Sequence, residues 1–246
     1  MKTKKFQPRF YREWVQSKDL INNHIIVKET DIYISSDVAL DENFLKDKIQ
    51  GYRKQIEDYI LVDKDFLTSL KPIDTIKPAP QIVKDMAQAT KIAGVGPMAA
   101  VAGAIAEYLA RDLEDKTKEL IIENGGDIFL KTETKRRIGI FAGESKLSGK
   151  IILEIEAEET PVGICTSSGT VGHSLSFGIT DATIILAKSL ILADAVATAT
   201  GNIVKKPEDI NKAIEFAKSI KDVTAAMVIV GDLMSAWGNL KIEKAK

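Results

Sequence analysis

The feature of the sequence that most constrains the fold is a series of short apolar segments joined by connections too short to hold a helix. Residues 137–142, 151–156 and 162–165 are rich in isoleucine, and residues 143–150 between the first two contain Gly, Ser and Lys. Parallel neighbouring strands need a crossover connection of a dozen or more residues. The spacing therefore predicts antiparallel strands in a meander.

The rest of the chain places strands and helices in runs, which favours an α+β fold over regular βαβ winding. Asp41 is a candidate N-cap for a helix whose apolar residues recur at helical spacing. We expect a single domain over residues 1–246, with an antiparallel sheet and helices packed on it. The further expected strands are 24–36 (a strand or hairpin), 120–124, 128–131, 182–187, 223–230 and 232–241, and the expected helices are 42–59, 81–90, one from Pro97, 189–200 and 207–220.

Composition excludes several classes of protein. The formal net charge of -1 leaves no excess of positive charge to favour a nucleic-acid partner. The longest apolar run, residues 182–199, is interrupted by Lys188 and Asp194, so we expect a buried core segment and no membrane span. A single cysteine allows no internal disulfide and fits a reducing compartment. We therefore expect a cytoplasmic protein.

Polar residues that could bind a ligand or take part in catalysis are concentrated between Cys165 and Asn202. Ser167, Ser168 and Gly169 belong to a segment of small hydroxylated residues whose N–H and O–H groups can converge on an anion. His173, a few residues later, is the candidate catalytic residue because imidazole titrates near neutral pH. Asp194 and Thr198 stand four residues apart on an expected helix, so both can reach one hard cation. The pattern predicts a binding site for a small phosphorylated ligand.

Each of these residues also has a purely structural interpretation. His173 can be a loop histidine bonded to backbone, and Asp194 can be a helix N-cap or can pair with a lysine. Cys165 follows an apolar segment and is expected to be a small buried hydrophobe. A helix beginning at Pro97 can either pack tightly in the core or direct its N-terminus at an anion.

Three motifs, in order, resemble those of the ApbE superfamily, the FAD:protein FMN transferases. They are Glu-Asn-Gly-Gly-Asp-Ile from residue 123, Thr-Ser-Ser-Gly from residue 166 with His173 downstream, and Leu-Ala-Asp-Ala-Val-Ala-Thr-Ala-Thr from residue 192. With the Gly/Ala-rich stretch around Pro97, they are most similar to a shorter ApbE-like branch of archaea and anaerobic bacteria. The resemblance covers residues 91–202.

The resemblance implies a two-layer fold with intertwined repeats and a flavin nucleotide site, for FAD or FMN, beside a magnesium ion. By motif position, Asp194 and Thr198 would bind the metal. Gly125, Gly126 and Asp127 would line the nucleotide site, and Ser167, Ser168 and Gly169 with His173 would face the phosphates. The transferases, however, carry an Ala-Lys-Gly turn where this chain has Gly96-Pro97-Met98, and their segment before the histidine is longer.

Two functions follow as hypotheses. The first is an ApbE-like protein with a metal-assisted site for a flavin or other phosphorylated ligand, related to flavin transferases. The second is a noncatalytic accessory or binding protein, in sulfur or homocysteine metabolism. Either is compatible with a homo-oligomer. In both, we expect the Ser-Gly loop and the helix of Asp194 to converge.

Overall fold

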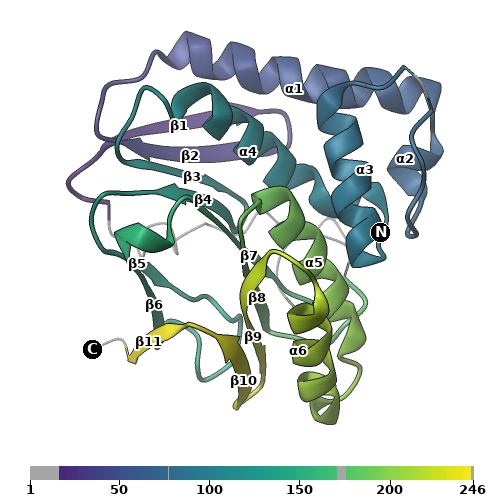
Figure 1. The fold of residues 1–246 in the computed structure, drawn as a ribbon, viewed down its shortest axis with the longest axis vertical. Coiled ribbons are helices and arrows are strands. Elements are labelled where there is room, and N and C mark those ends of the chain that lie inside the picture. Colours follow the sequence, from purple (N-terminus) through teal and green to yellow (C-terminus); the bar gives the residue numbers. More distant parts are fainter. Residues whose placement is uncertain (1–16, 77, 171–175, 245–246) are drawn as a thin grey trace.

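An eight-stranded antiparallel sheet organises the computed structural model of the chain, in which residues 17–76, 78–170 and 176–244 are described (Figure 1). Its strands lie in the order β1-β2-β3-β4-β7-β8-β9-β10. The strands are β1 (Ile21–Val27), β2 (Thr30–Ser36), β3 (Leu120–Asn124), β4 (Asp127–Lys131), β7 (Val162–Ser167), β8 (Ala182–Ala187), β9 (Val223–Val230) and β10 (Leu233–Gly238).

The sheet is built from two repeats with the same order of elements, a hairpin, then helices, then a second hairpin. The first repeat contributes β1 to β4 and the second contributes β7 to β10, and β4 pairs with β7 where the repeats meet. Between the hairpins lie α1 (Glu42–Val62), α2 (Asp65–Thr68), α3 (Gln81–Ala93), the 3-10 helix η2 (Pro97–Ala100) and α4 (Val101–Leu113) in the first repeat, and α5 (Leu190–Ile203), the 3-10 helix η4 (Pro207–Asp209) and α6 (Ile210–Ser219) in the second.

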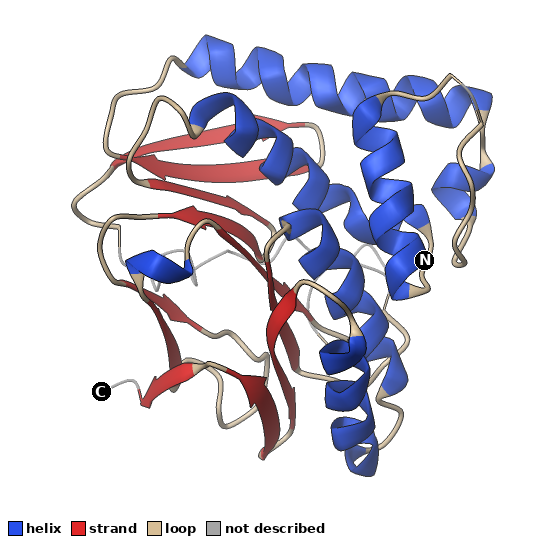
Figure 2. Ribbon diagram, viewed as in Figure 1, coloured by secondary structure: helices blue, strands red, loops and turns tan. Residues whose placement is uncertain are grey.

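The helices cover one face of the sheet (Figure 2). α5 packs against β7 and β8 and is flanked by α3, α4 and α6. It is apolar on nearly all sides because it is surrounded on nearly all sides, as expected for a core helix. This burial places the polar residues Asp194 and Thr200 of α5 inside the molecule. Among the described residues no single helix is long and apolar enough to cross a membrane, and only α3 with η2 and α4, bent by 103°, reach that length and composition together.

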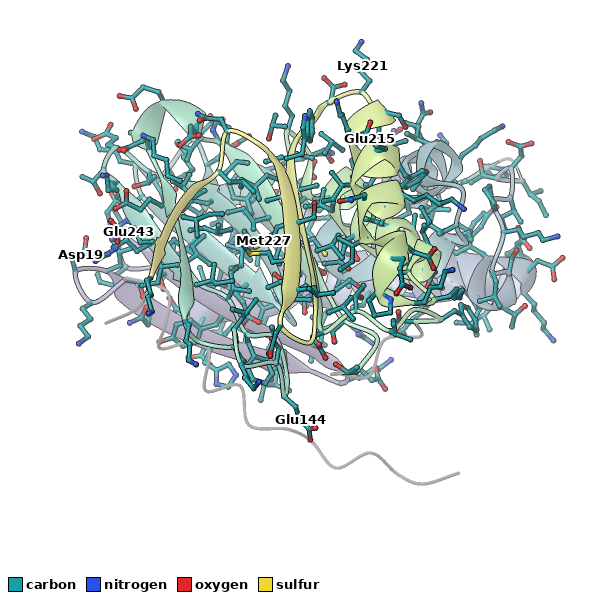
Figure 3. The ribbon with its side chains drawn as sticks, turned by 90° about the horizontal axis from the view of Figure 1, so that it is seen from below. Asp19, Glu144, Glu215, Lys221, Met227 and Glu243 are labelled. Carbon is teal, nitrogen blue, oxygen red and sulfur yellow. The ribbon has the colours of Figure 1, made fainter. Side chains whose placement is uncertain are left out.

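A second, three-stranded sheet covers part of the other face. It consists of β5 (Arg136–Gly139), β6 (Ile151–Ile155) and β11 (Lys241–Lys244), in the order β11-β6-β5. Apolar residues of β5 and β6, such as Ile138 and Leu153, form a separate core with Ile164, Ile184 and Met227 of the large sheet. Figure 3 shows Met227 in the interior, whereas Lys221 and Glu144 point outward at the edges of the molecule.

This second sheet corrects two expectations. The predicted meander is antiparallel, but only β5 and β6 pair with each other, and β7 lies in the large sheet between β4 and β8. Likewise the predicted strand 232–241 is divided between β10 and β11, one in each sheet. Buried and partly exposed residues alternate along β6, and its buried residues pack on the large sheet. β6 therefore belongs to a second sheet, in which β5 and β11 are its two neighbours.

Local sequence signals were reliable for single elements. Asp41 caps α1, its side chain accepting from the backbone N–H groups of Asn43 and Phe44. Gly125 and Gly126 both have positive φ, 70° and 109°, which is what a two-residue turn between β3 and β4 requires. That turn sets Asp127 as the first residue of β4.

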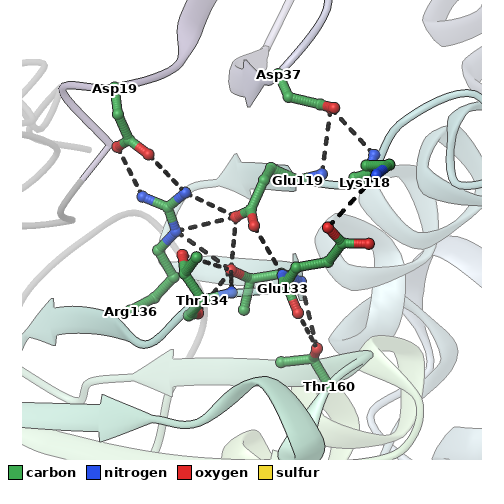
Figure 4. Close-up of polar contacts among 9 residues, drawn as sticks. Asp19, Asp37, Lys118, Glu119, Glu133, Thr134, Arg136 and Thr160 are labelled. Carbon is green, nitrogen blue, oxygen red and sulfur yellow. Dashed lines mark hydrogen bonds and ion pairs between the residues drawn. The ribbon is translucent and has the colours of Figure 1, made fainter.

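Arg136, at the start of β5, connects the two sheets and the N-terminal end of the described chain (Figure 4). Its buried guanidinium bonds both carboxylate oxygens of Asp19, at 2.7 and 2.9 Å, and reaches Glu119 at 2.7 Å. Glu119 immediately precedes β3 and is itself buried. The Arg136 guanidinium lowers the pKa of Asp19 by hydrogen bonding to its carboxylate.

Candidate functional site

Four elements meet at the N-terminus of α4. β4 contributes Asp127, β7 contributes Cys165 and α5 contributes Asp194, and all three side chains are buried. One possible ligand atom of each residue, a carboxylate oxygen or the sulfur, lies within 4.8 Å of those of the other two. Asp127 and Cys165 are register partners in the β4–β7 pair, so their side chains leave the same face of the sheet toward α5. We call these three residues the acidic cluster.

α5 places Asp194 in the cluster because it starts directly on β7. A Cβ on Gly163 would stand 2.4 Å from Leu190 Cα, so glycine is required for this close approach. Ser189 caps the helix, its Oγ accepting from the Leu192 N–H. Asp194 follows in the second turn and points at α4.

The N-terminus of α4 donates to Asp194. The Gly103 N–H, in the first turn of α4, lies 2.9 Å from Asp194 Oδ2. Such amide groups have no partner inside their own helix and favour an anion. A Cβ on Gly103 would lie 2.7 Å from Leu190 O and 2.9 Å from Asp194 Cβ, which again requires glycine. α4 is therefore both a packed core helix and a helix whose N-terminus faces an anion, a carboxylate of the chain itself.

The capping is reciprocal, because α4 sends a carboxylate to the N-terminus of α5. Glu107 Oε2 accepts from Ser189 Oγ at 2.7 Å and from Ile191 N at 3.0 Å. Its other oxygen accepts from Arg111, four residues further along α4, at 2.6 Å. Asp194 has Thr198 four residues along its helix instead, and no salt bridge to Asp194 occurs within the described part of the chain. The buried carboxylate of Glu107 is thus paired with the Arg111 guanidinium, whereas that of Asp194 has no such cation among the described residues.

Burial dominates the electrostatics of the cluster. It raises the pKa of Asp194 well above its usual value, the neighbouring Asp127 carboxylate raises it further, and the Gly103 N–H opposes both. Burial and the same two carboxylates raise the pKa of the Cys165 thiol. The cluster therefore disfavours two ionised carboxylates unless a positive charge lies between them.

The Ser-Gly loop approaches the Gly125-Gly126 turn and α5. The Thr166 N–H donates to Gly126 O at 3.1 Å, which brings the ends of β7 and of the β3–β4 hairpin together. Further along, a Cβ on Gly169 would meet Gly178 O, and one on Gly178 would meet Gly201 O of α5. The segment that follows the loop thus reaches the C-terminal end of α5, about two helical turns beyond Asp194.

The backbone of this loop makes its own hydrogen bonds. The Gly169 N–H donates to Thr180 O at 2.8 Å, and the Thr170 N–H donates to Ser168 Oγ at 3.1 Å. Thr170 Oγ1 donates in turn to Asp181, which also accepts from the Gly231 N–H at 2.7 Å. Asp181 therefore serves loop structure here.

The structure brings most of the predicted site residues to one region. Thr198 lies one turn beyond Asp194 on the same side of α5 and is half-buried. Gly126 and Asp127, next to Gly125 in the turn, lie beside Thr166 and Cys165, and Ser167 pairs with Thr183 of β8. His173 lies outside the described residues. Sequence reasoning missed Gly103 and Glu107, and the only signal for either was a glycine in an alanine-rich helix start.

A family model described as "AbpE bacteria" matches residues 12–240. The chain belongs to this ApbE-like family. A UPF0280 protein of Methanococcus aeolicus is 43% identical over 226 residues, which cover 90% of this chain and 91% of the relative. A UPF0280 protein of Methanocaldococcus jannaschii is 44% identical over 224 residues, covering 88% and 90%.

The ApbE-like chain shares its fold with solved flavin transferases. The flavinyl transferase ApbE of Pseudomonas stutzeri, in its apo form, matches with a TM-score of 0.63 and 13% identity over 89% of this chain and 93% of that chain. The flavin transferase ApbE from Vibrio cholerae matches with a TM-score of 0.60 and 12% identity, over 88% and 96%. At these identities the likeness concerns the fold, which agrees with the expected α+β architecture.

Proposed function

We propose that this chain is an ApbE-like protein whose acidic cluster, assisted by a divalent cation, binds a flavin nucleotide or another phosphorylated ligand. The observation that carries the proposal is the buried Asp127–Asp194 pair, which lies beside the Gly125-Gly126 turn without a salt bridge to Asp194 among the described residues. Burying the Asp194 carboxylate beside a second acidic group without a salt bridge of its own is costly. A bound cation removes that cost, and the family relationship makes magnesium the first ion to test.

The residues have distinct roles in this proposal. Asp194 and Thr198 hold the ion, and Asp127 faces it from β4. Gly125 and Gly126 let the nucleotide approach the backbone closely because they carry no side chain. When bound, the ion neutralises phosphate charge and stabilises the charge that develops during transfer.

The phosphates lie toward the end of β7. Ser167, Ser168 and Gly169, with His173 downstream, face them in this proposal, and His173 supplies or accepts the proton of a transfer reaction. A noncatalytic binding role is the second candidate. It is favoured by Gly96-Pro97-Met98 at the start of η2, where the resemblance leads us to expect a lysine. None of these three side chains carries an amine that could contact a phosphate.

The test is the ligand-induced shift of the melting temperature with FAD or FMN, measured against magnesium concentration. We expect wild type to be stabilised by about 2.7 kcal/mol when the nucleotide is at 100 times its Kd, and only with the cation. Asp194→Ala and Thr198→Val should lose this magnesium dependence, because each removes an oxygen ligand.

Thr200→Val is the matched control. Thr200 lies on the same helix, is fully buried, and its Oγ1 has no hydrogen-bond partner among the residues that the structure describes, so its loss should leave the magnesium dependence unchanged. Equal magnesium dependence in wild type, Asp194→Ala and Thr198→Val would contradict the metal assignment. Nucleotide binding without covalent flavin transfer would favour the binding role.

A further inference from the structure

The thiol of Cys165 lies against the carboxylate that the proposed function assigns to the metal. Its sulfur is 4.0 Å from Asp194 Oδ1, and Cys165 is the only cysteine of the chain. The side chain is 2% exposed. It is placed there by the β4–β7 register, opposite Asp127, and by the seating of α5 on β7. The pairing of β4 with β7 and the packing of α5 on β7 therefore place the thiol in the acidic cluster.

The spacing of the three groups suits ligands of a single ion. Metal–sulfur and metal–oxygen bonds of about 2.0–2.3 Å keep any two ligand atoms within about 4.6 Å of each other. The three ligand atoms of the acidic cluster already lie within 4.8 Å. Only a slight contraction is needed, and the cluster combines two hard oxygen donors with one soft sulfur donor.

A second observation, independent of the spacing, is the contrast between the two reciprocal caps. Glu107 is as buried as Asp194, and its carboxylate is balanced by Arg111 at 2.6 Å. Asp194 occupies the corresponding place at the other helix and has no salt bridge within the described residues. A positive charge that would balance Asp194 would therefore have to lie beside this carboxylate, next to the Cys165 sulfur.

We infer that Cys165 is a third protein ligand of the ion, with Asp127 and Asp194, so that the site prefers a transition dication of the zinc type to magnesium. The inference rests on the proposed function in assigning Asp194 to a metal. Magnesium prefers oxygen ligands alone, whereas thiolate ligands select zinc and other softer ions. The sulfur would thus set which ion the site takes, while Thr198 and the nucleotide complete its coordination.

Cobalt(II) is the probe that reports sulfur ligation directly. The full chain, freed of metal by a chelator, is titrated with cobalt(II), and its near-ultraviolet absorption is recorded. A sulfur-to-cobalt charge-transfer band is expected in wild type, and with one cysteine in the chain it can come only from Cys165. The band should be absent in Cys165→Ser and Cys165→Ala. Its absence in wild type would overturn the inference.

Calorimetric competition between zinc and magnesium gives the second readout. We expect Cys165→Ser and Cys165→Ala to lower zinc affinity at least about 10-fold, because the loss of a mere hydrogen-bond partner of a metal ligand already costs about 10–100-fold. Circular dichroism verifies that both variants fold. Equal zinc affinity in wild type and Cys165→Ser would overturn the inference even if cobalt binds elsewhere.

The outcomes separate this inference from the proposed function. Magnesium-dependent flavin binding without a sulfur–cobalt band would leave the proposed function in place and refute the role of Cys165. A sulfur–cobalt band that disappears in Asp194→Ala, without flavin binding in the presence of any ion, would support the role of Cys165 and refute the flavin nucleotide as the ligand.

Discussion

Each buried carboxylate is compensated by a specific neighbouring group. Glu119 is balanced by Arg136 and Glu107 by Arg111, whereas Asp194 is held by a backbone N–H and a shared cluster. The position of Asp194 in turn depends on a residue without a side chain, because a Cβ on Gly103 would overlap the Leu190 carbonyl and Asp194 Cβ. Gly103 is therefore as important to the site as a ligand.

Gly103→Ala should destabilise the protein by about 1–3 kcal/mol, the usual cost of overpacking a core, and should weaken metal binding because Asp194 is displaced. Gly51→Ala is the control. Gly51 lies inside α1 with nothing within 4 Å of its Cβ position, so alanine there should stabilise by about 0.4–1 kcal/mol. Urea unfolding of both variants measures the difference. Two variants of similar, increased stability would show that the α4–α5 contact is looser than the structure has it.

At the scale of elements, the contact between α4 and α5 organises the site. Each helix receives a carboxylate from the other at its N-terminus, so the two must dock in one register for either cap to form. Asn124 adds a third connection, its Nδ2 donating to Ala102 O at 2.9 Å. The β3–β4 hairpin, α4 and α5 thus hold the cluster as one unit.

Ser189 and Glu107 should therefore be energetically coupled. Ser189→Ala removes a helix cap and should cost about 0.5–2 kcal/mol. Because Ser189 Oγ also donates to Glu107 at 2.7 Å, the double variant with Glu107→Gln should depart from additivity by about 0.5–3 kcal/mol. A double-mutant cycle by urea unfolding measures this term, and strictly additive costs would show that the two caps act separately.

At the scale of the whole molecule, Arg136 joins parts that are distant in sequence. It lies in the second sheet and bonds Glu119 beside the large sheet and Asp19 near the N-terminal end of the described chain. Arg136→Met should cost about 3–5 kcal/mol, because it leaves Glu119 buried with an unpaired charge. Chemical denaturation measures the loss, and a cost below about 1 kcal/mol would mean that Glu119 is adequately held by Thr132 and backbone alone.

Asp19→Asn is the matched control, since the Asp19 side chain is 60% exposed and Glu119 still balances the Arg136 guanidinium in this variant, so we expect it to cost less than Arg136→Met. Hydrogen bonding to Arg136 lowers the pKa of Asp19 in the folded state. Its contribution is thus present above the unfolded pKa of about 3.9 and is lost as the pH falls through the folded pKa. Unfolding measured across that acidic range should be less pH-dependent in Asp19→Asn than in wild type.

The individual helices, strands and turns, and the family motifs, can be predicted from short stretches of the sequence. The Asp41 cap, the Gly125-Gly126 turn and the apolar periodicities depend on residues within a few positions of one another, so local physics is sufficient to predict them. The sequence also singled out Asp194 as an unusual carboxylate in an apolar helix, because a charge among alanines needs a partner wherever the helix lies.

Long-range contacts determine which sheet each strand joins and which groups surround Asp194. The apolar pattern is similar in β6 and β7, and their different sheets are settled by long-range packing that no local window contains. Asp127, Cys165 and Asp194 meet because the β4–β7 register and the close approach at Gly103 and Gly163 coincide at one point. Cys165 was expected to be a small buried hydrophobe and it is buried, but its neighbours are two carboxylates, which depends on pairings between segments far apart in the chain.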